Sequence, residues 1–100
     1  MSDLVHIVVT VRCFGMQTFQ TEVMHRRWAE EIFFEIPRGP FRVSKQDYDS
    51  QAGVLTVLVE IAGGWEFMAP LSRSEAFVVA SELERIGFDV ASAVIVQESG

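Results

Sequence analysis

The nine residues Leu4–Arg12, LVHIVVTVR, constrain the fold more than any other stretch of the chain. Most of them are β-branched, and their side chains alternate between an apolar set and a mixed set, which predicts a strand. The apolar set, expected to face the core, is Val5, Ile7, Val9 and Val11. The mixed set, expected on the other face, is Leu4, His6, Val8, Thr10 and Arg12.

Alternation predicts three further strands, with a short extra one between the second and the third of these. They are Phe41–Tyr48, Val54–Ala62 and Val90–Gln97, with the extra strand at Trp65–Ala69. The segment DSQAG between the first two is expected to be a turn.

Two helices are expected. Ser72-Arg-Ser-Glu75 is a capping box, and Ala76, Phe77, Ala80 and Leu83 give helical spacing up to Ile86, after which Gly87 ends the helix. Residues 17–36 read as an earlier helix that Pro37 ends, with Thr18 or Thr21 as its cap. Its apolar residues form two stripes, so either the helix is apolar around most of its circumference or it starts late and residues 16–23 are extended.

The resulting order is β-α-β-β-α-β over a single α+β domain of residues 1–100. Its simplest arrangement is a ferredoxin-like sandwich, in which two helices cover one face of an antiparallel sheet and the short strand near 65–69 is added. The first and third strands are then central neighbours. This arrangement hosts many unrelated functions and identifies none by itself.

Gly63-Gly64 separates two extended segments and predicts a two-residue hairpin turn, because glycine tolerates positive φ at both positions. In that register Glu60 pairs with Phe67 and Leu58 with Ala69. Trp65 and Phe67 then lie on the face that the helices leave open. A phosphate-binding loop is less favoured, because eight residues separate Gly64 from the helix cap at Ser72.

The open face is therefore expected to be too apolar for water, and we expect it to form the interface of a homodimer. The predicted interface residues are Leu4, His6, Val8, Thr10, Leu58, Glu60, Trp65 and Phe67. A different protein or a hydrophobic small molecule could cover the same face.

His6 and Glu60 on this face allow two interpretations. They could belong to an ion pair at the rim of a dimer, or to an acid–base site walled by Trp65 and Phe67. The first is favoured, because one histidine without an orienting neighbour is a weak catalytic signal. A non-enzymatic interaction module is thus expected, with a dimeric α+β-barrel enzyme as an alternative.

Charge excludes some partners. The formal net charge is −6, which argues against binding to the phosphate backbone of nucleic acid despite the basic stretch MHRRW. The first 45 residues carry a net charge of +1 and residues 46–100 carry −7. A second alternative is therefore an acidic inhibitor or immunity-type protein that neutralises a basic partner.

No cofactor or metal is expected. Asp47 and Asp49 begin like a calcium loop, but Ala52 and Leu58 stand where that loop needs glycine and glutamate. His6 and His25 lack companions at a zinc-binding spacing. Cys13 is the only cysteine and is expected to be a small buried hydrophobic residue in a cytoplasmic protein. The N-terminal apolar run is too short to span a membrane, so no membrane association is expected.

Overall fold

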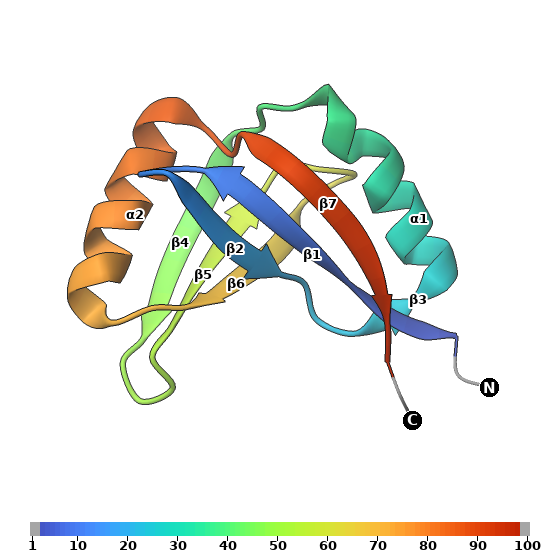
Figure 1. Cartoon of the computed structure of the whole chain (residues 1–100), viewed down its shortest axis with the longest axis horizontal. Helices are drawn as coiled ribbons and strands as arrows, with labels where there is room; N and C mark the ends of the chain where they lie inside the picture. The colour runs from blue at the N-terminus through green and yellow to red at the C-terminus, as the bar shows by residue number, and fades with distance from the viewer. Residues whose placement is uncertain (1–2, 99–100) are drawn as a thin grey trace.

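A computed structural model of the chain describes residues 3–98. Over these residues it contains a curled seven-stranded sheet and two α-helices, α1 (Arg26–Glu35) and α2 (Arg73–Ile86). The strands are β1 (Leu4–Arg12), β2 (Met16–Gln20), β3 (Met24–His25), β4 (Val43–Asp49), β5 (Val54–Val59), β6 (Trp65–Pro70) and β7 (Val90–Gln97). Figure 1 shows α1 at one side of the strands and α2 at the other.

The ferredoxin-like prediction is wrong. All strand pairs in the described residues are antiparallel, and β1 lies between β7 on one edge and β2 and β3 on the other. The order continues through β6 and β5 to β4, so the first strand and β5 are separated by β2 and β6. The two helices do not share one face of a flat sheet. They lie at opposite sides of a half-barrel, with α1 against β1 and β7, and α2 against β4 and β5.

The expected early helix is replaced by two strands and a shorter helix. Cys13-Phe14-Gly15 turns the chain, with positive φ at Phe14 and Gly15, and β2 pairs back along β1. Thr21, considered as a helix cap, is instead buried, and its Oγ1 accepts a hydrogen bond from the Ile7 amide at 2.9 Å. The second alternative, an extended segment before a late helix, is the one observed, because Phe19 is fully buried against the core.

The turn at Gly63-Gly64 exists, but it is longer than predicted. Strand β5 ends at Val59, and the chain folds the side chain of Ile61 into the core, leaving it 1% exposed. Burying a side chain of this size is worth about 1.5–3 kcal/mol, which favours a five-residue connection over a two-residue turn. Phe67 consequently pairs with Val57 instead of Glu60. A shift of three residues is odd, so it moves Phe67 to the opposite face of the sheet.

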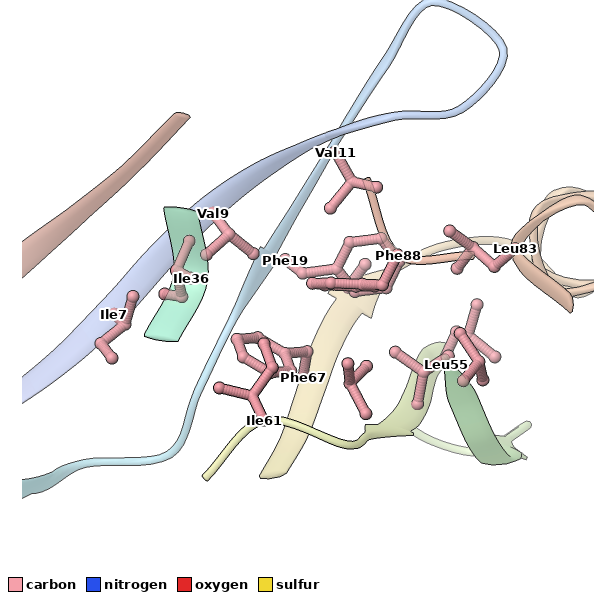
Figure 2. Packing of buried hydrophobic residues seen from close by; sticks show 14 of the residues in the cluster. Ile7, Val9, Val11, Phe19, Ile36, Leu55, Ile61, Phe67, Leu83 and Phe88 are labelled. Carbon is pink, nitrogen blue, oxygen red and sulfur yellow. The ribbon is translucent and has the colours of Figure 1, made fainter. Parts of the chain in front are cut away.

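An isolated β-bridge joins two segments of the half-barrel that are far apart in sequence. Phe41 and Phe88 exchange backbone hydrogen bonds, which links the segment before β4 to the segment before β7. Inside the half-barrel, the centre of the Phe88 ring lies 4.9 Å from the centre of the Phe67 ring and 5.6 Å from that of the Phe19 ring. Figure 2 shows these rings with Ile7, Val9 and Val11 on one side and Leu55 and Ile61 on the other.

Helix α2 begins as predicted. The Ser72 hydroxyl accepts a hydrogen bond from the Glu75 amide at 3.4 Å and lies 2.6 Å from the Glu75 carboxylate. Gly87, with φ of 86°, follows its last residue. One expected core residue is misplaced, however: Phe77 is 76% exposed, and Val79 is buried instead.

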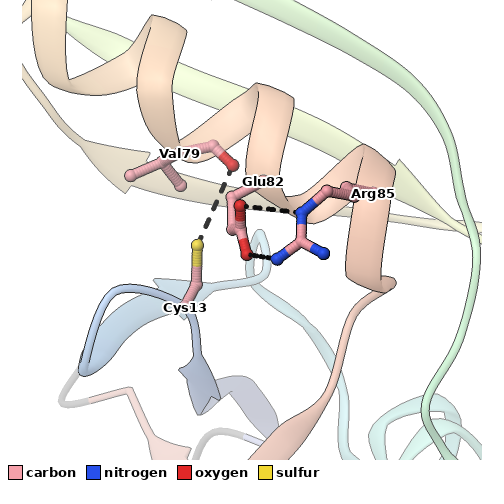
Figure 3. A network of polar contacts seen from close by, with 4 residues as sticks. All are labelled: Cys13, Val79, Glu82 and Arg85. Carbon is pink, nitrogen blue, oxygen red and sulfur yellow. Dashed lines mark hydrogen bonds and ion pairs between the residues drawn. The ribbon is translucent and has the colours of Figure 1, made fainter.

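Cys13 is buried where the β1–β2 turn meets α2, as expected. Its thiol donates to the carbonyl oxygen of Val79, with 3.9 Å between Sγ and O (Figure 3). Burial raises the pKa of Cys13, and the negative charge of Glu82 raises it further. Glu82 itself pairs with Arg85 one turn later on the helix.

Candidate functional site

The outer side of strands β1 and β7 carries the strongest candidate for a functional surface. Because Val5, Ile7, Val9 and Val11 all point into the core, the alternate residues of β1 point outward. Val8 lies opposite Val94 of β7, and His6 lies opposite Val96. Cross-strand partners share a face, so Leu4, His6, Val8, Val94 and Val96 form one surface, which we name the β1–β7 face.

This face leaves aliphatic side chains in water. Val94 is 54% exposed, Leu4 39% and Val96 36%. The buried residues of α1, Ala29 and Ile32, belong to the core on the inner side of the sheet. Strand β7, VASAVIVQ, contains no charged residue from Val90 to Gln97. An exposed aliphatic sheet surface of this kind is typical of an interaction site.

A single ion pair lies within the β1–β7 face. His6 Nδ1 is 2.6 Å from an oxygen of the Glu98 carboxylate, and the His6 side chain is 18% exposed. Since a carboxylate only accepts, the ring N–H donates and Glu98 orients the imidazole. Arg12 pairs with Asp89 at 3.0 Å at the far end of the same two strands. The Arg12–Asp89 pair lies beyond the face, whereas His6 lies between Leu4 and Val8 on β1, so the His6–Glu98 pair lies among the aliphatic side chains.

The remaining predicted site residues do not join this face. Leu58 points outward from β5, but β2 and β6 lie between it and β1. Glu60 is exposed beyond the end of β5, and its amide donates to the Arg42 carbonyl. The His6–Glu60 site is therefore not assembled. Thr10 is on the outer side of β1, opposite Ser92 and Thr18.

Trp65 and Phe67 were placed on the wrong side of the sheet. Phe67 is fully buried, and Trp65 packs against the core from the same side as Val59. The Trp65 ring meets Trp28 of α1 edge to face, with 6.3 Å between the ring centres. The physical reason is the longer turn, which changes the pairing register by an odd number of residues.

Val94 and Val96 were missed, although the alternation in VASAVIVQ contained the signal. Val94 and Val96 fall on one side of this strand, and Ala93 and Ile95 fall on the other. Alternation alone does not say which set faces the core. That assignment depends on the pairing of β7 with β1, a contact between opposite ends of the chain.

The acidic turn after β4 has a structural explanation. An oxygen of the Asp49 carboxylate accepts hydrogen bonds from the amides of Gln51 and Ala52, which closes the turn into β5. Over residues 3–98 no three His, Cys, Asp or Glu side chains gather in a way that could hold a metal ion. Within the same residues, neither helix is long and apolar enough to cross a membrane.

Comparison of the chain with protein-family models, curated proteins and solved structures finds no match.

Proposed function

We propose that this protein is a non-enzymatic interaction module that forms a homodimer through the β1–β7 face. The observation that carries the proposal is the set of exposed aliphatic side chains, Leu4, Val94 and Val96, on the outer side of β1 and β7, while the buried residues of α1 pack into the core on the inner side. Each would gain part of the roughly 1.5–3 kcal/mol that full burial of such a side chain provides.

Charge limits which surface a second copy of the same chain could use. With a net charge of −6, two copies repel each other across most orientations. The repulsion is weakest where β7 presents no charged residue and where the nearby charges are already paired, as in Arg12–Asp89. A two-fold axis through this face would bring Val94 of each copy near Val8 or Val94 of the other.

A second copy would cover a limited part of the molecule. A specific interface covers about 800 Å² on each partner. One chain exposes 6226 Å², so such an interface would occupy only a modest part of its surface. The His6–Glu98 pair would then be enclosed by aliphatic side chains, where it would set orientation more than affinity.

The test compares two substitutions of exposed valines. Val94 is 54% exposed on β7, and Val78 is 49% exposed on α2. Val94→Lys should weaken self-association at least about tenfold, because it brings a charge into an apolar contact. Val78→Lys makes the same chemical change on a different surface and should leave association unchanged. Light scattering across a dilution series measures both, and equal effects of the two variants would contradict the proposal.

A further inference from the structure

The outer edge of β7 is distinct from the β1–β7 face, because it consists of backbone groups in the plane of the sheet. Strand β7 pairs with β1 on one side, and no other strand of the described residues pairs with it. The amide of Glu98 donates to the carbonyl of Leu4, so every second residue of β7, counted back from Glu98, bonds to β1. The amides and carbonyls of Ala93 and Ile95 therefore point toward the unpaired side, which we name the β7 edge.

Strands β4 and β7 are each paired on one side only, but they differ in how that edge is protected. Strand β4 carries Lys45, Asp47 and Asp49, and charged side chains discourage another strand from pairing. Strand β7 has no charged residue and no proline, and its pairing with β1 is irregular only between Val90 and Ser92. Residues 93–96 thus form a regular, unprotected edge, which is the structure that β-strand addition requires.

An apolar groove lies beside the start of the β7 edge. It has a volume of about 260 Å³ and separates β7 from α1 and from the 3₁₀ turn that follows it, η1 (Ile36–Arg38). Figure 1 shows α1 on the side of β7 away from β1. Phe33 and Pro37 line one wall, and the small residues Ala91 and Ala93 leave room at the other. An engineered cavity of about 150 Å³ holds benzene, so this groove can take one large apolar side chain.

A strand added to the β7 edge would place a side chain in this groove. Cross-strand partners share a face of the sheet, so a peptide residue paired with Ala93 would present its side chain on the same face as Ala93. That face is the inner one, because Ala93 packs against the core, as Phe33 of α1 does. An apolar side chain at this position of the peptide would therefore contact Phe33.

Charge indicates what kind of segment fits. Among the described residues that line the groove, Asp89 alone is charged. Its side chain is 41% exposed, and one carboxylate oxygen pairs with Arg12 at 3.0 Å. A carboxylate has further lone pairs, so Asp89 can also accept a hydrogen bond from a basic side chain of a partner. The net charge of −6 attracts such a segment toward the molecule.

A second copy of the chain fits the β7 edge less well. If two β7 strands paired antiparallel with Val94 opposite Val94, Glu98 of one copy would lie opposite Val90 of the other. That position is next to Asp89, so two carboxylates would approach each other at each end of the paired strands. Like charges close together across a strand pair are destabilising, which favours a basic segment of another protein.

We propose that the β7 edge binds an extended basic segment of another protein as an added antiparallel strand. The backbone groups of Ala93 and Ile95 supply the hydrogen bonds, which do not depend on the sequence of the segment. The groove beside Phe33 selects an apolar side chain, and Asp89 selects a lysine or arginine close to it. This proposal is independent of the homodimer, because it uses the edge of the sheet and not its outer face.

The test is an NMR titration of the whole ¹⁵N-labelled protein with the synthetic peptide acetyl-KTVTLKK-amide, whose leucine would pair with Ala93. The dissociation constant is expected to be on the order of 1 mM or lower. The amide protons of Ala93 and Ile95 should shift downfield and become protected from exchange, while those of Val94 and Val96, already bonded to β1, should change little. No shifts at about 10 mM, or shifts without this alternation, would overturn the proposal.

Hydrogen exchange of the protein alone tests the free edge. The amides of Ala93 and Ile95 should exchange faster than those of Val94 and Val96. Protection of all four that grows with protein concentration would show that a second copy covers the edge and would overturn the proposal.

Modified peptides separate the three contacts. N-methylation of the leucine removes the N–H that bonds to the protein and should weaken binding at least about fivefold, whereas N-methylation of the threonine before it, whose N–H points away, should not. Serine in place of the leucine should also weaken binding at least about fivefold, because the groove then holds no apolar group. Acetyl-ETVTLEE-amide should bind at least about tenfold more weakly, with a smaller difference at high salt.

Protein variants complete the test. Ala93→Pro removes only an edge amide, so it should weaken peptide binding at least about fivefold and lower the thermal midpoint less than Val94→Pro, which removes a bond to β1. Asp89→Asn should weaken binding about threefold or more, whereas Glu66→Gln, a matched loss of charge on β6, should not. Binding that survives both Ala93→Pro and Asp89→Asn would contradict the inference. If Ala93→Pro does not fold, the N-methylated peptides make the same test.

Discussion

Replacing Phe67 tests the pairing register of β5 and β6, which determines which side chains of β6 face the core. Phe67 is fully buried, pairs with Val57 and lies 4.9 Å from the ring of Phe88. In the register expected from a two-residue glycine turn, the same side chain would point away from the core. The two registers therefore predict different losses of stability for one substitution.

The expected loss is large. Truncating a core phenylalanine to alanine removes its transfer free energy and leaves a cavity, at a cost of about 3–5 kcal/mol. For a chain of this size each kcal/mol lowers the thermal midpoint by about 4–8 °C, so Phe67→Ala should lower it by about 12 °C or more. Urea unfolding followed by tryptophan fluorescence measures the free energy directly. Phe67→Leu, expected to cost about 1–3 kcal/mol, covers the case in which the alanine variant does not fold.

Met68 provides the control, because it is the next residue on β6 and points outward from the sheet. Met68→Ala should cost about 1 kcal/mol or less. If Phe67→Ala were no more destabilising than Met68→Ala, Phe67 would not face the core, and the face assignments for β6 would be wrong.

Three further predictions concern local contacts. Ser72→Ala should lower the unfolding free energy by about 1 kcal/mol through loss of the helix cap, while Ser74→Ala should change it far less, as measured by urea denaturation. The Cys13 thiol should react with a disulfide reagent much more slowly in the folded than in the unfolded protein. Because folding raises the pKa of Cys13, the free energy of unfolding should fall as the pH rises above the pKa of the thiol in the unfolded chain, and Cys13→Ala should abolish that part of the fall. A double-mutant cycle with Trp28→Ala and Trp65→Ala should give a coupling of about 0.5–1.5 kcal/mol, whereas a coupling near zero would contradict the edge-to-face contact.

Features fixed by neighbouring residues could be predicted from the sequence. Strands β1 and β7 have the predicted bounds, because each alternates over eight or nine residues. Helix α2 also begins and ends as expected, because Ser72, Glu75 and Gly87 act on the backbone within one turn.

Features fixed by distant contacts could not be predicted. Phe19 and Ile61 adopt their positions because each fills the core, and their local sequence is compatible with a helix or a straight strand. One neighbour of β1 is β7, which comes from the other end of the chain. The outward placement of the predicted residues on β1 agrees with the structure, whereas Trp65 and Phe67 on β6 lie on the core side and Val94 and Val96 on β7 were not predicted.

The most direct test of the homodimer proposal is an isotope-filtered NOE experiment on a mixture of ¹³C-labelled and unlabelled protein, which detects only contacts between copies. The proposal predicts intermolecular cross-peaks from the methyl groups of Leu4, Val8, Val94 and Val96, in a particle of twice the 11.2 kDa mass of one chain. Cross-peaks confined to another surface, such as those from Val78 or Val23, or a monomeric mass without intermolecular cross-peaks, would contradict it.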